Sequence, residues 1–392
     1  MEQVLNNCVD KNLYVWMPIP IFGSGSSEEK AVGYWPGAPQ LDAKAPTAHE
    51  SSLVSFFNLV IGTINHACVM VTIRWVQFSP TAVSRQLRMW SADSAMCPLS
   101  GGDAMRKPDM SCWLATGSQF DWRHLATFAE VKNRRGKDNK KLLYIELAGK
   151  ASCLLYAQDG CHTAPCLRIL GSQIYLTVFD CGRSLSTCGY NINHCPHEFL
   201  HILISVTSTP HNILGFDISI NWGERNCQDG KLVGVKELKI EMDTTTYTIE
   251  LKRVLFISDN LFGRGTTVWE GMMKVRGTSG MQARQVAVKD SWIDPLQKYT
   301  EGKILSILNV YKIEGIPTLV HKEQVKAPHL STNIQVNSSM HFLRAYLTHC
   351  KTNPYYLHIS SHIITHPVSN LITKFSCLGE LLVAFLDCIV GE

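Results

Sequence analysis

The sequence has few charged residues and almost no net charge of either sign. Of its 392 residues, 18% are charged, and 37 Lys plus Arg against 33 Asp plus Glu give a net charge of +4. Apolar residues make up 45% of the chain, whereas disordered proteins combine low hydrophobicity with high net charge. The composition therefore excludes disorder. So small a charge gives no indication of a nucleic-acid or membrane partner, and we expect neither.

The 14 cysteines include no Cys-x-x-Cys pair, and the N-terminus does not have the form of a secretory signal. Six cysteines lie between Cys153 and Cys195, but structural zinc sites usually take their ligands from tight pairs on turns. We therefore expect free thiols, no metal, and a reducing compartment in which disulfides are rare.

No long apolar stretch is free of polar residues. The most apolar one, residues 53–73, is long enough to cross a bilayer, at about 20 residues, but Asn58, Asn65 and His66 interrupt it. We expect a buried helix, or a helix followed by a strand, rather than a membrane span. The preceding residues 1–50 are rich in Gly, Pro, Ser and Ala, which predicts an irregular N-terminal arm.

The rest of the chain predicts two domains and an α+β fold class. Residues 51–222 alternate strands and helices, which indicates an N-terminal α/β domain. The elements expected there are a strand ending at Lys132, a helix over 142–158, two strands over 168–180 and a helix over 197–207. Residues 223–392 form the second domain. Its expected elements are strands over 235–242, 247–257 and 285–290 and a helix over 295–308.

The strongest functional motif is a glycine loop followed by a strand lysine and a helix acid. Glycines let a backbone turn approach phosphates closely, because no Cβ intervenes. A lysine on the next strand can pair with the phosphates and with a helix glutamate, as in protein kinases. The sequence therefore predicts a nucleotide site in which a glutamate orients the lysine. Its residues are Gly263, Arg264, Gly265, Thr266 and Thr267 in the loop, Lys289 in Val-Ala-Val-Lys, and Glu301 in the helix.

The glycine loop departs from the kinase pattern G-x-G-x-x-G-x-V. Val268 stands where the third glycine is expected, and Glu270 stands where the valine is expected. A Gly-x-Gly pair alone is a weak signal. A plain β-hairpin turn is therefore the alternative interpretation of this segment.

These motifs resemble those of the fungal-type protein kinase family. The resemblance extends beyond the nucleotide motifs in both directions and covers approximately residues 120–392. The segments that carry it are Phe128–Lys132, Val178–Gly182, Gly263–Trp269, Val286–Trp292, the Glu301 helix, Glu314–Pro317 and Ile363–Glu380.

The resemblance implies a fold and an activity for the second domain. Residues 223–392 would form an incomplete protein-kinase-like N-lobe, an antiparallel sheet with one helix, followed by the hinge and the first C-lobe helix. The implied cofactor is ATP with Mg, and the implied reaction is phosphoryl transfer to a Ser or Thr hydroxyl. The resemblance also implies an intracellular protein, either cytoplasmic or nuclear.

The family's catalytic elements are missing from the sequence. It holds no His-Arg-Asp triplet and no Asp-Phe-Gly triplet, which in kinases supply the catalytic base and a magnesium ligand. Cys181 also stands where the family usually has Arg. We therefore expect a truncated protein or a pseudokinase that is inactive as it stands. The alternative is a non-catalytic interaction module, and a protein partner would cover the exposed face of the lobe.

A second motif suggests a different chemistry in the first domain. Asp121, Glu130 and Lys132 resemble the Asp…Glu-x-Lys arrangement of the restriction-endonuclease-like superfamily, with Gln158 on the following helix. Two carboxylates can hold a divalent ion while a lysine steadies an attacking water. This alternative predicts a metal-dependent nuclease-like site. The competing interpretation is a salt bridge at the end of a strand.

Overall fold

The computed structural model of the chain consists of two compact units. Unit 1 comprises Met1–Phe179 and Arg183–Gly215, and unit 2 comprises Asp180–Gly182 and Phe216–Glu392. This division differs from a boundary at residue 223 because the residues from Phe216 onward already belong to unit 2. The structure describes residues 5–6, 8–9, 11–16, 33–39, 49–75, 88–114, 120–132, 137–182, 184–208, 214–217, 219–222, 226–228, 231–233, 236–242, 245–277, 280–294, 296–325, 358–369, 377–379 and 382–383.

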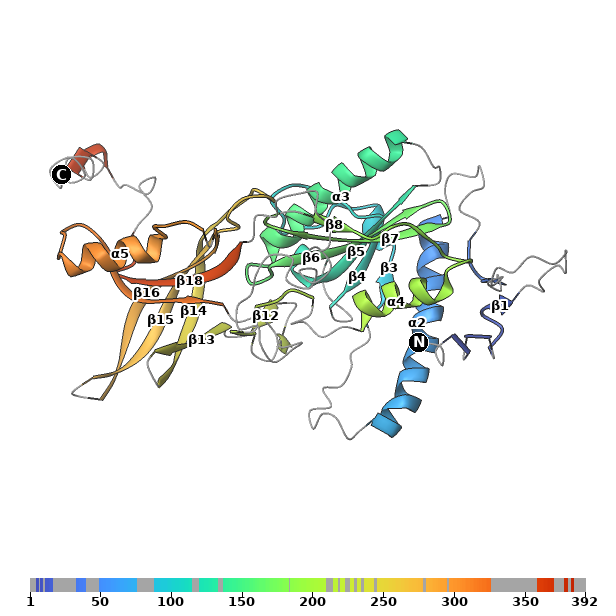
Figure 1. The fold of residues 1–392 in the computed structure, drawn as a ribbon, viewed down its shortest axis with the longest axis horizontal. Helices are drawn as coiled ribbons and strands as arrows, with labels where there is room; N and C mark the ends of the chain where they lie inside the picture. The colour runs from blue at the N-terminus through green and yellow to red at the C-terminus, as the bar shows by residue number, and fades with distance from the viewer. Residues whose placement is uncertain are drawn as a thin grey trace. The chain divides into compact units, whose positions relative to one another are not determined.

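Unit 1 is built on a mixed sheet in the order β3-β4-β5-β6-β7-β8, with β9 paired to β7 (Figure 1). Strands β5 and β6 run parallel, β4 and β5 run antiparallel, and a separate ribbon joins β1 to β2. The helices and strands of this unit are β1 Val15–Trp16, β2 Gly33–Tyr34, α2 His49–Trp75, β3 Trp90–Ser91, β4 Met110–Trp113, β5 Leu125–Lys132, α3 Lys137–Ala157, β6 Thr163–Leu170, β7 Gln173–Asp180, β8 Ser184–Ser186, β9 Tyr190–Asn191 and α4 Pro196–Thr207, with short 3-10 turns at Asp93–Ala95 and Trp122–His124.

Strand β5 is buried on both faces of this sheet. Side chains alternate along a strand, so Ala129 and Val131 point to one face, where they share an apolar core with Phe199 of α4. Glu130 points to the opposite face, where it pairs with Lys150 of α3. Burying a charge is costly unless it is paired. Glu130, the one acid of β5, meets this requirement through its ion pair with Lys150.

Described residues of the predicted N-terminal arm take part in the core of unit 1, which its composition does not suggest. Tyr14 and Trp35 are buried with ring centroids 4.8 Å apart, and the Trp35 Nε1 donates a hydrogen bond to the carbonyl of Ile192 at 2.8 Å. Aromatic burial therefore helps to fix the described part of this segment, together with the short ribbon of β1 and β2. The apolar stretch that follows forms the single helix α2, without a strand. Among the described residues, no helix combines the length and the apolar character needed to cross a bilayer.

Unit 2 is built on an antiparallel sheet in the order β10-β13-β14-β15-β16-β18-β17, and it also contains helix α5 (Figure 1). A small ribbon joins β11 to β12. The elements are β10 Ile220–Trp222, β11 Asn226–Gln228, β12 Lys231–Val233, β13 Lys236–Met242, β14 Thr245–Ile257, β15 Thr267–Gly277, β16 Gly280–Ile293, α5 Glu301–Val310, β17 Thr318–Gln324 and β18 Ile359–His366.

The two faces of this sheet have different chemistry. Val286 and Val288 of β16 join the apolar core of the unit together with Ile364 of β18. Lys289 and Ile363 are cross-strand partners on the other face, which is the face that α5 covers, since Lys289 pairs with the first residue of that helix. Alternation along β16 therefore separates the core from the side chains that can meet a ligand.

Helix α5 begins at Glu301, later than residue 295 where the sequence predicts it. The preceding residues form a turn instead, because the Asp294 side chain accepts a hydrogen bond from the backbone N–H of Leu296 at 2.8 Å. Such local capping of the backbone competes with helix formation. Thr300 then takes the N-cap position of the helix.

Candidate functional site

Lys289 and Glu301, two residues of the predicted nucleotide site, form an ion pair. The Lys289 Nζ lies 2.5 Å from the Glu301 Oε2, with 29% and 41% of the two side chains exposed. Lys289 is held on β16 between its cross-strand partners Val268 and Ile363. Glu301 occupies the first turn of α5, where a negative charge complements the helix dipole. The pair is thus rigidly placed and open to solvent.

The glycine loop between β14 and β15 is packed against two other segments of unit 2. The N–H of Gly263 donates to the carbonyl of Cys181 at 2.7 Å, and the N–H of Trp292 donates to the carbonyl of Arg264 at 2.8 Å. Gly265 has a φ of +50°, and a Cβ there would lie 2.9 Å from the Cys181 Cβ. A glycine is therefore required at this position for both conformation and space.

The remaining loop residues differ in how they face solvent. Arg264 is exposed, Thr266 is partly exposed, and Thr267 is buried at the start of β15. Because the Gly263 N–H already has an acceptor, the loop as it stands does not present that donor to a phosphate. Of the residues predicted to bind nucleotide, Lys289 and Arg264 carry the accessible positive charge.

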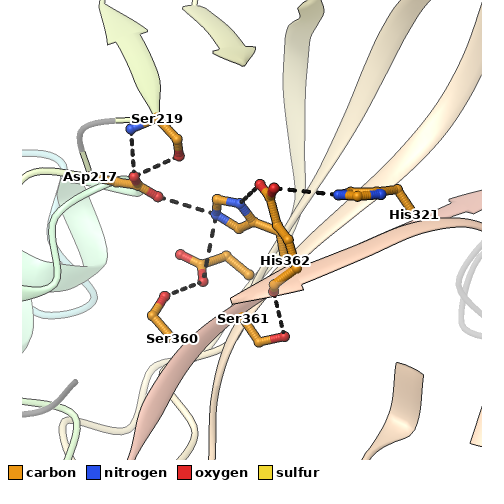
Figure 2. Close-up of polar contacts among 8 residues, drawn as sticks. Asp217, Ser219, His321, Ser360, Ser361 and His362 are labelled. Atoms are coloured by element: carbon orange, nitrogen blue, oxygen red, sulfur yellow. Dashed lines mark hydrogen bonds and ion pairs between the residues drawn. The ribbon is translucent and has the colours of Figure 1, made fainter. Parts of the chain in front are cut away.

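A buried imidazole on the opposite face of the sheet forms a second polar cluster, which the sequence did not reveal (Figure 2). His362 of β18 is fully buried, and its Nε2 lies 3.1 Å from the Asp217 carboxylate and 4.0 Å from that of Asp290. Its Nδ1 lies 3.3 Å from the Glu323 carboxylate. With acceptors at both ring nitrogens, the ring is held as an imidazolium.

The pKa values in this cluster follow from its charges. Burial alone would lower the pKa of His362, but its contacts with the carboxylates of Asp217 and Glu323 outweigh burial and raise the pKa to about 10. Burial alone would raise the pKa of Glu323, but hydrogen bonds from His321 and His362 lower it to about 2. The cluster is therefore ionised at neutral pH, and it joins β16, β17 and β18 through charged contacts.

Two serines donate further hydrogen bonds to the acids of this cluster. Asp217 accepts hydrogen bonds from the N–H and the hydroxyl of Ser219 at 2.8 and 2.6 Å, and Ser360 donates to Asp290 at 3.2 Å (Figure 2). A lone histidine in an alternating strand gives no sign of such partners, since they come from three other segments of the chain. The registers Asp290↔His362 and Glu323↔His362 bring two of these acids to the histidine.

The three residues of the nuclease-like alternative have separate partners in unit 1. Asp121 is buried and accepts from the Arg123 side chain at 2.9 and 2.7 Å and from Ser100 at 2.8 Å. Burial opposes the shift, but these hydrogen bonds lower the pKa of Asp121. Glu130 pairs with Lys150, as noted above. The structure therefore uses Asp121 to anchor a turn rather than to meet Glu130.

Lys132 and Gln158 are also engaged. The Lys132 Nζ lies 3.2 Å from the Glu146 carboxylate. The Gln158 Nε2 donates to the carbonyls of Trp122 and Leu125 at 2.9 and 2.6 Å. Gln158, the residue after α3, thus links that helix to the start of β5. The sequence alone gives no sign of whether a polar residue at this position has a structural or a catalytic role.

The hinge and the last expected helix lie mostly outside the described residues. Of the segment 363–380, the structure describes 363–369 and 377–379, and of the residues after 380, where the resemblance places the first C-lobe helix, it describes 382–383. Leu378, Leu382 and Val383 are exposed in that part.

In the comparison with protein families, residues 110–392 match a family model described as fungal protein kinase. This range takes in unit 1 from β4 onward and all of unit 2. None of the curated proteins and none of the solved structures matches the chain.

Proposed function

We propose that this chain, which belongs to the fungal protein kinase family, binds the phosphates of ATP through Lys289 on the α5 face of unit 2. The observation that carries the proposal is the ion pair between Lys289 and Glu301. An ammonium group has three donors, so a glutamate can orient Lys289 while other donors reach a phosphate. Protein kinases use a strand lysine and a helix glutamate in this way.

The glycine loop contributes less to the proposed phosphate binding than Lys289 does. Thr266 and the exposed Arg264 lie at the turn that leads into β15, next to the strand that carries Lys289. The N–H of Gly263 is bonded to Cys181, so a phosphate would have to replace that acceptor to use it. We therefore assign the larger share of phosphate binding to Lys289.

We propose nucleotide binding alone, without magnesium binding or phosphoryl transfer. ATP supplies the phosphoryl group in the family's reaction, but residues 1–392 contain no His-Arg-Asp or Asp-Phe-Gly triplet. Among the described residues, no group of three metal-ligating side chains includes Glu301 or a residue of the glycine loop. The residues here fit the phosphates and not a magnesium site, so we propose binding without transfer by residues 1–392 alone.

A thermal-shift titration of the full chain tests the proposal. A ligand at ten times its dissociation constant stabilises the state that binds it by about 1.4 kcal/mol, and Tm should rise by a few degrees. Lys289→Ala should abolish the shift, whereas Lys303→Ala, which removes an exposed lysine of α5, should leave it intact. No shift in the wild type, or an equal shift in Lys289→Ala, would contradict nucleotide binding.

A non-catalytic interaction function is the second candidate. Ile304, Ile307 and Val310 of α5 are exposed, and apolar residues gathered on one helix are typical of a protein interface. Self-association of the full chain in sedimentation, abolished by Ile307→Glu, would support this candidate. It would do so most clearly if ATP produced no thermal shift.

A further inference from the structure

We propose that Asp109 and Glu130 of unit 1 form a binding site for a small divalent cation. This site is independent of the nucleotide proposal, because its residues lie on β5 and in the segment just before β4. Asp109 was not among the acids that the sequence singled out.

The strand register brings the two carboxylates together. Met110 of β4 is paired with Ala129 of β5, so Asp109, one residue earlier, lies across from Glu130. The N–H of Asp109 donates to the Glu130 Oε1 at 3.3 Å, and the Asp109 Oδ2 accepts from the N–H of Val131 at 2.8 Å. The Asp109 carboxylate is therefore anchored to the backbone of β5 immediately beside Glu130.

An unpartnered oxygen provides the independent sign of a missing ligand. The Glu130 side chain is completely buried, its Oε1 meets Lys150 and Asp109, and its Oε2 has no hydrogen-bond partner among the described residues. A buried carboxylate oxygen without a partner is costly. A cation bound to Oε2 would remove that cost.

The surrounding charges leave room for added positive charge. Asp109, Glu130 and Glu146 are the acids of this face, and Lys132 and Lys150 are the bases. Lys150 pairs with Glu130 and Lys132 pairs with Glu146. Among the described residues the Asp109 carboxylate has no lysine partner, so one negative charge of this face is not balanced.

The ligand atoms select the kind of cation. Both candidate ligands are carboxylates, and carboxylate oxygens suit Mg²⁺ and Mn²⁺ rather than thiolate-preferring ions. The nearby thiol of Cys166 is buried and donates to the carbonyl of Thr177 at 3.3 Å. Asp109 is partly exposed, so one ligand faces solvent while the other is buried, and the cation has a route of entry.

Mn²⁺ binding to the full chain, without nucleotide, tests this site. Free Mn²⁺ is followed by electron paramagnetic resonance at pH 8, where Glu130 is ionised. The wild type should take up Mn²⁺ saturably, and Asp109→Asn should weaken the affinity at least tenfold. Asp93→Asn, which changes an exposed acid of the same unit, should bind as the wild type does. Mg²⁺ should compete for the site.

Glu130→Gln provides the second variant, with folding checked by circular dichroism. If it is folded, it should lose affinity at least as strongly as Asp109→Asn. If it is unfolded, the partly exposed Asp109→Asn alone decides the matter. No saturable uptake by the wild type, or wild-type affinity in Asp109→Asn, would overturn the proposal. Neither result bears on ATP binding in unit 2, so the two proposals fail separately.

Discussion

Each unit contains a lysine–glutamate pair that joins a strand to a helix, and the two pairs differ in burial. In unit 1, Lys150 of α3 pairs with Glu130 of β5, with 10% and none of the two side chains exposed. In unit 2, Lys289 of β16 pairs with Glu301 of α5, with 29% and 41% exposed. The same ammonium–carboxylate pair is therefore shielded from water in unit 1 and partly open to water in unit 2.

The difference in burial determines whether the lysine of each pair can exchange its glutamate for another partner. Losing one partner of a buried pair leaves an unpaired charge in a medium that solvates it poorly. An exposed pair contributes little to stability because water screens it and replaces either partner. Lys289 can therefore exchange its contact with Glu301 for a phosphate at little cost, whereas Lys150 cannot leave Glu130 unless another cation takes its place.

The largest expected effect comes from breaking the buried pair. Lys150→Met keeps most of the side-chain volume but leaves Glu130 unpaired, and we expect a loss of about 3–5 kcal/mol in the free energy of unfolding at pH 8. Denaturant unfolding measures it. Lys141→Met, at an exposed position of the same helix, is the control and should change stability by less than about 0.5 kcal/mol. Equal effects in the two variants would show that the pair is not the cause.

A pH titration gives an intermediate effect and sharpens the comparison. Because the pKa of Glu130 is about 7 in the folded state against 4.5 for the ordinary group, the folded chain binds this proton more tightly than the unfolded chain. The contribution of Glu130 to stability therefore falls as the pH rises from about 4.5 to about 7 and is level above that. The difference in unfolding free energy between wild type and Glu130→Gln should follow this curve. A difference independent of pH would contradict it.

The smallest expected effect comes from the exposed pair. Glu301→Gln should change the free energy of unfolding by less than about 1 kcal/mol, since water screens the pair. It should nevertheless reduce the thermal shift produced by ATP, because Lys289 would lose the partner that orients it. A destabilisation as large as that of Lys150→Met would mean that burial does not distinguish the two pairs.

The sequence predicts local structure and the order of motifs better than it predicts contacts. Alternating apolar residues predict β13, β14 and β16 because the face of a strand is decided by neighbours along the chain. The Lys289 and Glu301 contact is also predictable, since it joins two consecutive elements. The N-terminal segment was misjudged because Trp35 finds its partner at Ile192, and composition carries no information about a contact so distant in sequence.

The candidate metal ligands show the same limit more sharply. Asp121 lies closer to Glu130 in sequence, but Arg123 and Ser100 occupy its carboxylate. Asp109 lies further away and reaches Glu130 through the register of β4 on β5. That register is set by strand pairing, which is non-local. The cluster around His362 depends in the same way on strand pairing in unit 2, and no motif announces it.

The packing of the glycine loop has a spectroscopic consequence. Trp292, at the end of β16, is 3% exposed, and a Cβ on Gly265 would lie 3.0 Å from the indole Cδ1. The backbone N–H of Trp292 also donates a hydrogen bond to the carbonyl of Arg264. Any displacement of the loop from β16 would change the polarity and quenching around this indole. The chain thus carries an intrinsic fluorophore at its glycine loop. Trp292 is one of nine tryptophans, so the difference in emission between the wild type and Trp292→Phe would report loop movement without an added label.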